Sequence, residues 1–508
     1  MTDGQAQVVI SGAGPNGLML ACELALAGIR PVVLDKLPGP SSEPKANGLV
    51  GQVVRLMDMR GLYRAFTGDE HPPQPSIGWL FAAMPLNFLG VPDNPMYAMR
   101  MPQPRLVRLL EKRARDLGVD LRWGHELVGL QPGPESVALT VSSPERDYQL
   151  AAGYLVGADG AHSLVRKALG IDFPGTTSPT VSRLAHVRIP EQLRRADGGI
   201  DVPGFGPIPF GHNRFDRGGV MYAEFEPGRS LFGTIEFGPP VEEVPMSLAE
   251  LRESVRRVLG VDVPFEEPKG AGPHALRRIN GQNTRHAEHY RDGRVLLLGD
   301  AAHVHSPMGG PGLNLGLQDT MNLGWKLAAQ INGWAPAGLL DSFESERHPV
   351  GERVVMQSLS QTALMMPGPE VAALRTLLGE LFTIPEASKH MAALLAGSDV
   401  RYDVGDDHPL SGRLVPDLTL TDGRRVAELL HEARPVLLDL AGGGIADALC
   451  GWANRVDTVC AHIADPPAAA MLIRPDGYIA WAANVFGPAE EAGLRAALHR
   501  WFGPELRG

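Results

Sequence analysis

Cysteine is scarce in this sequence, and long apolar runs are missing. Cys22, Cys450 and Cys460 are the three cysteines among 508 residues. Because none of them forms a CxxC pair, the sequence excludes a disulfide framework and a cysteine-based zinc cluster. No stretch of about 18 uninterrupted apolar residues is present, so the sequence predicts no membrane span. The first residues lack the charged and apolar regions of a secretory signal, and we expect a cytoplasmic protein.

The sequence also has fewer basic than acidic residues. The chain has 47 Lys and Arg against 58 Asp and Glu, which gives a formal net charge of −11. Proteins that bind nucleic acid usually show a basic excess or stripe, so nucleic acid is not an expected partner. A local basic pocket for a phosphate-bearing cofactor remains compatible with this charge. At roughly 150 residues per domain, the length predicts about two to four domains.

A β-α-β unit is predicted at the start of the chain. An apolar strand at 8–10 leads directly into Gly-Ala-Gly-Pro-Asn-Gly at 12–17, and an Ala- and Leu-rich helix follows at 18–26. A second strand at 31–34 ends at Asp35. In a G-x-G-x-x-G turn the glycines permit a tight turn, a close approach of backbone N–H groups to a pyrophosphate, and close helix–strand packing. The acidic residue can accept both ribose hydroxyls, so the unit predicts a dinucleotide site for NAD(P) or FAD.

Two further Gly-rich acidic elements distinguish this chain from a simple dehydrogenase. The strand at 154–156 runs into Gly157-Ala158-Asp159-Gly160, and the strand at 294–298 runs into Gly299-Asp300. Between them, residues 180–237 alternate short strand-like runs with turn residues, which indicates an antiparallel sheet. A flavoenzyme of the disulfide-reductase type would need a second complete fingerprint and a redox cysteine pair. Neither is present.

The three motifs, in this order and spacing, resemble the class A flavoprotein monooxygenases of the para-hydroxybenzoate hydroxylase fold. Within that class the sequence is most similar to the polyketide and antibiotic hydroxylases that carry a C-terminal thioredoxin-like domain. The resemblance covers essentially the whole chain and is strongest at 12–17, 159–166 and 299–326. It implies a mixed α/β and α+β fold: a Rossmann-like FAD-binding domain, an inserted and mostly antiparallel β-sheet substrate domain, and the thioredoxin-like domain.

The resemblance also implies domain boundaries. We expect the FAD-binding domain to be discontinuous, and the substrate-binding sheet to be inserted into it. The last domain is expected after a stretch rich in Asp and Gly near 399–409. The expected ranges are 1–75, 100–179 and 286–398 for the FAD-binding domain, 76–99 and 180–285 for the substrate domain, and 399–508 for the thioredoxin-like domain.

Roles for individual residues follow from the resemblance. The first glycine motif and Asp35 are expected to hold the ADP half of FAD, and Asp300 its ribityl and pyrophosphate region. The loop 307–314 is expected to face the isoalloxazine ring, and Arg166 to support the loop at Asp159. The expected cofactor-binding residues are Gly12, Gly14, Pro15, Asn16, Gly17, Asp35, Lys36, Lys45, Gln103, Leu127, Asp159, Gly160, Asp300, Pro307, Gly310, Gly312, Leu313 and Asn314.

Several positions depart from the family pattern. Lys45 stands where many relatives carry Arg, and it lacks the planar fork of a guanidinium. Pro311 stands where Gln is frequent, which leaves the flavin loop stiffer but without one side-chain donor. His303 and His305 form an H-x-H pattern that occurs in metal sites. The resemblance assigns both histidines to packing and loop geometry, so we expect no metal.

The C-terminal domain is expected to be redox-inactive. Where a thioredoxin-like fold carries its cysteine pair, the sequence reads Ala441-Gly442-Gly443-Gly444-Ile445. The glycines could mimic a nucleotide loop, but no fingerprint completes them. Cys450 and Cys460 do not form a redox motif, and we interpret the domain as serving packing or assembly.

The expected reaction belongs mainly to the cofactor. NAD(P)H reduces FAD, O2 adds at flavin C4a, and the resulting hydroperoxide transfers one oxygen to an aromatic polycyclic substrate. No acid–base residue is obligatory; weak candidates are His212, Arg214, Tyr222, Glu236 and His274, each more often structural.

Other functions remain open at this point. A Baeyer–Villiger oxygenase on the same fold and a non-catalytic flavin- or ligand-binding protein are the alternatives. A flavin halogenase is disfavoured because the chain has no W-x-W-x-I-P element. The choice between NADH and NADPH and the existence of a homodimer stay undecided.

Overall fold

A parallel sheet forms the centre of the cofactor-facing part of the molecule. The computed structural model describes residues 5–43, 45–226, 228–242, 244–268, 275–440, 442, 445 and 451–505. The strand order is β18-β19-β10-β1-β2-β7, and the pairs β19–β10, β10–β1, β1–β2 and β2–β7 are parallel. The strands are β1 (Gln5–Ser11), β2 (Val32–Asp35), β7 (Asp120–Trp123), β10 (Tyr148–Gly157), β18 (Arg291–Asp292) and β19 (Val295–Leu297), with β8 (Glu126–Pro132) and β9 (Val137–Ser142) continuing from β10.

This strand order brings the three predicted motifs together. In parallel strands the carboxyl ends lie at one edge of the sheet, and open α/β sheets bind their ligands there. The Gly-rich turn follows β1, the Asp159 turn follows β10, and the Asp300 turn follows β19. Because β1, β10 and β19 are neighbours, all three turns lie side by side at this edge.

Helices α1 (Pro15–Leu26), α4 (Gln103–Asp116) and α7 (Pro311–Ile331) pack around this sheet. The apolar residues Leu106, Val107, Leu110 and Ala114 recur at helical spacing, and α4 buries them on one side. α1 and α7 approach closely because Gly324 has no side chain. A Cβ at Gly324 would lie 2.7 Å from Cβ of Glu23. The two helices therefore share one packed interface.

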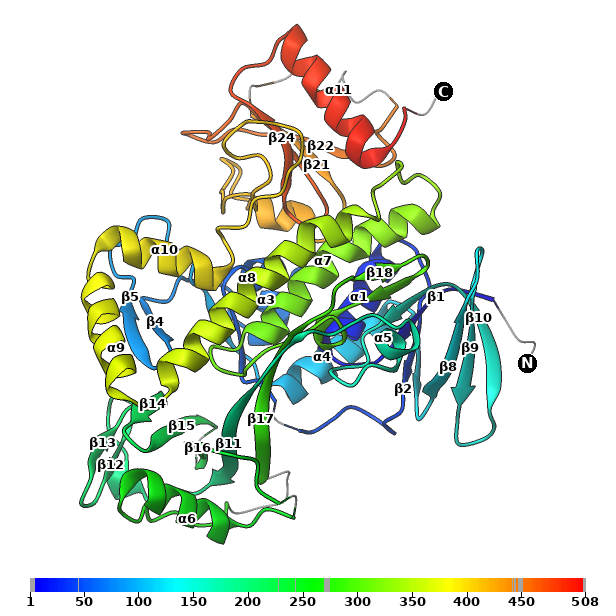
Figure 1. The fold of residues 1–508 in the computed structure, drawn as a ribbon. Coiled ribbons are helices and arrows are strands. Elements are labelled where there is room, and N and C mark those ends of the chain that lie inside the picture. Colours follow the sequence, from blue (N-terminus) through cyan, green and yellow to red (C-terminus); the bar gives the residue numbers. More distant parts are fainter. Residues whose placement is uncertain are drawn as a thin grey trace.

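A second, antiparallel sheet lies beside the first, at the lower left of Figure 1. Its order is β14-β15-β16-β11-β17-β20, as the turn-rich sequence of this region predicts. Helix α6 (Leu248–Leu259) covers one face and buries Leu251 and Val255 against it. The strands are β11 (Gly175–Val187), β14 (Gly211–Phe215), β15 (Gly218–Glu226), β16 (Arg229–Phe237), β17 (Arg277–His286) and β20 (His303–Val304).

Smaller elements complete the amino-terminal three quarters of the chain. Short strand pairs join β3 (Gly48–Val50) to β6 (Ala98–Arg100), β4 (Gly78–Phe81) to β5 (Met84–Asn87), and β12 (Ile200–Val202) to β13 (Gly206–Ile208). The remaining helices are α2 (Gln52–Asp58), α3 (Leu62–Thr67), α5 (Leu164–Ala168), α8 (Ser342–Met365), α9 (Pro369–Leu381) and α10 (Pro385–Ala396). No helix of the described residues is long and apolar enough to cross a bilayer.

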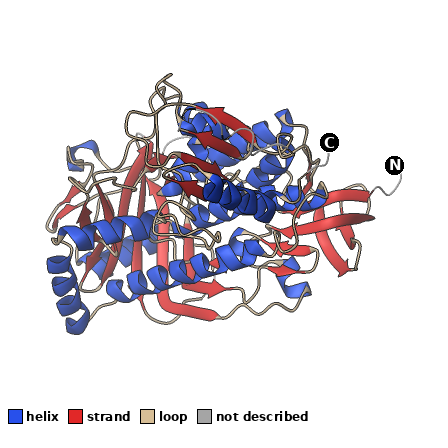
Figure 2. Cartoon of the chain, turned by 90° about the horizontal axis from the view of Figure 1, so that it is seen from above, coloured by secondary structure: helices blue, strands red, loops and turns tan. Residues whose placement is uncertain are grey.

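The C-terminal unit, defined here as residues 399–505, has its own sheet. The order is β22-β21-β23-β24, with β21 and β22 parallel and the other two pairs antiparallel. Its elements are β21 (Val436–Asp439), β22 (Asp457–Cys460), β23 (Ala470–Ile473), β24 (Ile479–Ala483) and α11 (Pro488–Phe502). The unit, coloured orange to red in Figure 1, lies on α7 and α8. Figure 2 gives the view from above, with long helices crossing the middle of the molecule.

Candidate active site

The Gly-rich turn after β1 is shaped by close backbone packing. Gly12 has a φ of +111°, and a Cβ there would lie 2.2 Å from the carbonyl oxygen of Ala158. A Cβ at Gly17 would lie 2.0 Å from the carbonyl oxygen of Gly12. Gly14 differs, because its Cβ would meet no atom of the described residues within 4 Å. Gly14 is the N-cap of α1 without a side-chain cap, so the start of this helix has room for an anion beside it.

Asp35 is held at the end of β2 by backbone donors. Its Oδ2 accepts a hydrogen bond from the Ala13 amide at 2.8 Å, and its Oδ1 accepts one from the Leu37 amide at 2.9 Å. The neighbouring Lys36 is exposed. The His125 amide donates to the Asp35 carbonyl at 2.9 Å, which brings the start of β8, including buried Leu127, to the same place. One end of the candidate cofactor site is therefore formed where β2 ends and β8 begins, at Asp35, Lys36 and Leu127.

Lys45 and Gln103 are brought together by backbone pairing. The Gln103 amide donates to the Ala46 carbonyl at 2.8 Å, and the Met101 amide donates to the Asn47 carbonyl at 3.1 Å. Gln103 is half-buried, whereas Lys45 is exposed and its ammonium lies 3.8 Å from the Glu43 carboxylate. This lysine is thus an exposed point charge beside the turn.

The Asp159 turn caps α5 and is tied to the Asp300 turn by one arginine. Asp159 Oδ2 accepts from the Leu164 amide at 2.8 Å, and Gly160 has a φ of +84° with open space around it. Arg166 is buried, and its guanidinium donates to the carbonyl oxygens of Ala301 at 2.8 Å and Ala161 at 3.0 Å. Burial lowers the pKa of Arg166. The residue supports the Asp159 loop, as expected.

Asn16, in the first turn of α1, packs against Gly299 and against Gly316 of α7. A Cβ at Gly299 or at Gly316 would lie 2.1 Å or 2.3 Å from Asn16 Nδ2, so a larger residue at either position would displace this side chain. Asn16 Oδ1 and Asp159 Oδ1 are buried without a hydrogen-bond partner among the described residues. Both oxygens retain an acceptor for a ligand N–H or O–H group, which fits a dinucleotide at this edge.

The loop 307–314 is locked at its helical end. Gly310, with a φ of +68°, is the N-cap of α7, and Pro311 is the first helical residue. Asn314 Nδ2 donates to the Gly310 carbonyl at 2.6 Å, while its Oδ1 accepts from the Val50 amide at 2.9 Å. A Cβ at Gly312 would lie 3.8 Å from Asp300 Oδ1, so the exposed Asp300 carboxylate faces this loop. Pro307 is exposed at the start of the loop and Leu313 is half-buried.

The weak acid–base candidates separate onto two faces of the second sheet. His212 and Arg214 pair with Met221 and Gly219, on the face away from α6. The Arg214 guanidinium donates to the Met366 carbonyl at 2.9 Å. Burial lowers the pKa of His212 to about 4, so this imidazole is neutral at neutral pH. Both residues lie on the face turned toward the cofactor-facing part of the molecule.

Tyr222 and Glu236 lie on the α6 face and have structural contacts. Tyr222 is 2% exposed and packs against Phe232. Glu236 accepts hydrogen bonds from Arg183, from Ser254 at 2.5 Å and from Arg257 at 2.7 Å. Burial would raise the pKa of Glu236, but the hydrogen bonds from Arg257 and Ser254 keep it below its usual value. His274, the fifth candidate, lies outside the described residues.

The histidines of the H-x-H pattern are engaged in packing. His303 Nε2 lies 2.7 Å from Asp319 Oδ2, and the His303 ring stacks on His305 with centroids 5.3 Å apart. Sequence reasoning missed Asp319 and its partner Arg347. The available signal was a carboxylate inside the highly specific motif 299–326, on a helix that is otherwise mostly apolar.

One cavity lies away from the cofactor turns. It has a volume of about 1190 Å³ and is lined by the β4–β5 hairpin, Arg214, α9 and α10. A cavity of about 50 Å³ lies at the loop itself, between Gly309, Asn314, Trp79 and α8. The turns at Gly12, Asp159 and Asp300 contribute no lining residue to either.

Comparisons with known proteins agree with this site. Residues 5–358 match the FAD binding domain family, and residues 408–504 match the family described as aromatic-ring hydroxylase, C-terminal. The chain therefore belongs to the FAD-dependent aromatic-ring hydroxylases, and it is a flavoprotein monooxygenase.

Individual relatives span nearly the full chain. The chain is 42% identical to a 12-dehydrotetracycline 5-monooxygenase/anhydrotetracycline 6-monooxygenase of Streptomyces rimosus, over 98% of this chain and 99% of that protein. It is 35% identical to a dialkyldecalin synthase of Streptomyces rugosporus, over 98% and 99% of the two chains. The solved structure of OxyS anhydrotetracycline hydroxylase from Streptomyces rimosus superposes with a TM-score of 0.87 at 40% identity, covering 99% of this chain and 100% of that one.

Proposed function

We propose that the protein is an FAD-dependent, NAD(P)H-consuming monooxygenase that hydroxylates an aromatic polycyclic substrate of the polyketide or antibiotic type. The observation that carries this proposal is the meeting of three Gly-rich turns at one sheet edge, beside a second sheet that α6 covers on one face only. The names of the relatives support the substrate class, since those from Streptomyces rimosus are named for oxygenation of tetracycline-type polycycles.

The residues of the sheet edge would hold FAD along its length. The open N-terminus of α1 would bind the pyrophosphate, and Asp35 would bind the ribose of the ADP half. Asp300 would contact the ribityl region, and the N-terminus of α7 would favour negative charge at the isoalloxazine ring. Bound FAD, once reduced by NAD(P)H, would supply activated O2 at its C4a position.

The protein's own part is to orient the substrate and to exclude water. We place the substrate between the loop 307–314 and the face of the second sheet that α6 does not cover. Gln282 links these two parts: its Oε1 accepts from Ser306 Oγ at 2.8 Å, and its Nε2 donates to Ser182 Oγ at 3.1 Å. His212 and Arg214 lie on this same face. A neutral His212 imidazole can accept a hydrogen bond from a phenol.

The domain organisation is part of the proposal. The two-sheet arrangement supports the expected FAD-binding and substrate domains with the ranges given above. The order β22-β21-β23-β24, with one parallel pair, supports a thioredoxin-like fold for the C-terminal unit. Desolvation and the Asp439 carboxylate raise the pKa of Cys460, which disfavours the reactive thiolate and supports a redox-inactive unit. Cys450 and most of 441–445 lie outside the described residues.

Three measurements test the proposal. The purified protein should carry FAD, show flavin absorbance, and oxidise NAD(P)H faster when anhydrotetracycline or another polycyclic phenol is added. The product should gain one oxygen by mass, and NMR should place it on a ring carbon. A protein that binds no flavin would refute the proposal, and NMR showing a lactone would replace it with Baeyer–Villiger oxidation.

A second candidate rests on one comparison. The relative named dialkyldecalin synthase shares 35% identity over nearly the whole chain, and its name describes no oxygenation. This protein would then bind flavin and substrate without oxygen transfer. Tight ligand binding with no stimulation of NAD(P)H oxidation across a panel of polycycles would favour this candidate.

A further inference from the structure

Each of the two cofactor-facing helices carries one buried carboxylate at the same distance from its start. Glu23 follows Pro15, the first residue of α1, by eight positions. Asp319 follows Pro311, the first residue of α7, by the same eight positions. The two residues are 2% and 1% exposed. Buried carboxylates require charged or hydrogen-bonding partners, so their partners show what holds these helices in place.

The partner of Glu23 is Arg60, which also reaches the C-terminal unit. Arg60 Nε and Nη2 each donate to the Glu23 carboxylate at 2.8 Å, which is a bidentate contact. Its Nη1 donates to the Leu430 carbonyl at 2.8 Å, and its Nη2 donates to the Pro475 carbonyl at 2.7 Å. One buried guanidinium therefore joins α1 to two segments of the C-terminal unit.

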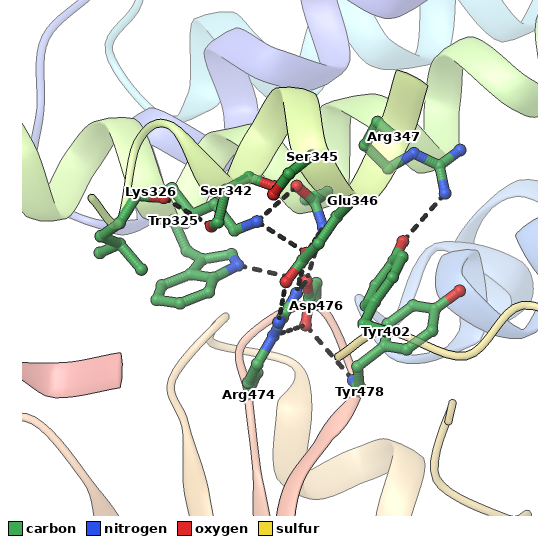
Figure 3. Close-up of polar contacts among 12 residues, drawn as sticks. Trp325, Lys326, Ser342, Ser345, Glu346, Arg347, Tyr402, Arg474, Asp476 and Tyr478 are labelled. Carbon is green, nitrogen blue, oxygen red and sulfur yellow. Dashed lines mark hydrogen bonds and ion pairs between the residues drawn. The ribbon is translucent and has the colours of Figure 1, made fainter. Parts of the chain in front are cut away.

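The partner of Asp319 is Arg347 of α8, which is fully buried. Arg347 Nε donates to Asp319 Oδ1 at 2.6 Å, and its Nη1 donates to the hydroxyl of Tyr402 at 2.9 Å. Figure 3 shows the Arg347 guanidinium pointing toward Tyr402. On its other side Asp319 contacts His303, in the strand directly after the Asp300 turn. A continuous chain of buried polar groups thus runs from the C-terminal unit to the cofactor turn.

A third buried polar cluster lies next to the polar groups that link Tyr402 to His303. Arg474, in the turn between β23 and β24, donates to both oxygens of Glu346 at 2.7 and 2.8 Å. Lys326 Nζ of α7 lies 2.7 Å from Glu346 Oε2, and Arg474 also pairs with Asp476 (Figure 3). Two cations and two carboxylates balance in charge. The end of α7 away from the cofactor is therefore fixed to the C-terminal unit as well.

We propose that the C-terminal unit positions both cofactor-facing helices, with Arg60 and Arg347 as the positioning residues that connect it to α1 and α7. Neither arginine contacts the turns that face the cofactor. A helix transmits a displacement along its axis, so a shift of either carboxylate moves the N–H groups at the helix start. The affinity for FAD then depends on contacts made by a unit that carries no cofactor residue. The inference rests on the FAD site of the proposed function, and it does not require hydroxylation.

The test removes both members of the Arg347–Asp319 pair together, so that neither is left as an unpaired buried charge. The double variant Arg347→Met, Asp319→Leu replaces both charges by apolar side chains, which is often neutral for stability. Tyr402→Phe removes only the hydroxyl that Arg347 contacts. The full-length apoprotein is titrated with FAD by fluorescence, and hydrogen exchange is measured at residues 12–18 and 309–316. We expect the dissociation constant for FAD to rise about tenfold in the double variant, with faster exchange in both segments.

A matched control removes a different pair between the same two parts. Arg425 of the C-terminal unit pairs with Asp58 of α2 at 2.6 Å and contacts neither α1 nor α7. Asp58→Leu, Arg425→Met is expected to leave the affinity for FAD within about twofold of wild type. Equal losses of affinity in both double variants would overturn the inference, and so would an unchanged affinity in the Arg347 variant. A wild-type protein that fails to bind FAD refutes the proposed function instead.

Discussion

The two sheets of the cofactor and substrate regions support function in different ways. At the edge of the parallel sheet, glycines and backbone atoms form much of the site, because a Cβ at Gly12 or Gly17 would lie less than 2.5 Å from a backbone carbonyl oxygen. In the antiparallel sheet, the side chains matter, and they alternate between α6 and the opposite face. A site formed by backbone atoms can be predicted from a short sequence motif. A site formed by side chains also depends on which face of the sheet another element covers.

Gly12→Ala should have the largest effect. It tests whether the site at the edge of the parallel sheet depends on close backbone packing. The new Cβ would lie 2.2 Å from the Ala158 carbonyl oxygen, so the turn must move. We expect a protein purified without FAD, checked by its visible absorbance and by thermal unfolding. Gly14→Ala is the matched control, because no atom of the described residues lies within 4 Å of its Cβ. It should lower the affinity for FAD while changing the free energy of unfolding by about 1 kcal/mol or less. Equal destabilisation by both substitutions would contradict this distinction.

Glu346→Gln tests a region that belongs to neither sheet. The variant leaves buried Arg474 and Lys326 without their shared carboxylate, and we expect a loss of about 3–5 kcal/mol in the free energy of unfolding. Burial would raise the pKa of Glu346, but the charges of Arg474 and Lys326 hold it well below its usual value. The ionised form therefore stabilises the fold above pH 4.5, the ordinary value for this group, and that contribution is lost as pH falls further.

Urea unfolding at neutral pH and at values below 4.5 measures this contribution. The wild type should lose stability across that range, and the variant should lose less. An identical pH dependence in the two proteins would show that Glu346 is not the titrating group.

Glu236→Gln tests whether side chains on the α6 face of the antiparallel sheet serve stability and not catalysis. The substitution weakens the contact with Arg257, which holds α6 to the sheet, and the contact with Arg183 of the neighbouring strand β11, so we expect a loss of about 1–3 kcal/mol in unfolding free energy. The affinity for FAD should stay at the wild-type value. A change in the pH profile of turnover, without loss of stability, would instead make Glu236 an acid–base residue.

His212→Gln tests the opposite face and has the smallest expected effect on the protein itself. Gln keeps a hydrogen-bonding group but changes its position, so kcat/KM for a phenolic polycycle should fall about tenfold. The affinity for FAD and the free energy of unfolding should remain at wild-type values. Steady-state kinetics and an FAD titration check this. Unchanged kcat/KM would remove His212 from the substrate site.

The sequence predicted the parallel sheet edge well because its signals are local. The Gly-rich turn, Asp35 and the Asp159 and Asp300 turns each follow an apolar strand, and strand order alone brings them together. The separation of His212 from Tyr222 and Glu236 was not predictable in the same way. It depends on the register of three antiparallel strands and on the face that α6 covers, and neither is encoded within one strand.

The buried arginine–carboxylate pairs were beyond sequence reasoning for a related reason. Arg60 and Glu23 are 37 residues apart, and Arg347 and Asp319 are 28 apart. Each arginine lies in a different element from its carboxylate. Charged residues in helices usually face solvent, so the pattern alone gives no reason to bury them.

The pairing of β17 with β20 sets a rule for exchanging parts between relatives. Arg285 and His286 pair with Val304 and His303, so the last strand of the substrate sheet shares hydrogen bonds with the strand that leaves the Asp300 turn. A chimera joined after His286 would take Arg285 and His286 from the donor and their partners His303 and Val304 from the recipient. A joint placed before Arg285 keeps all four residues, and therefore this register, within the recipient. Substrate sheets recombined in this way should retain the flavin of the recipient protein.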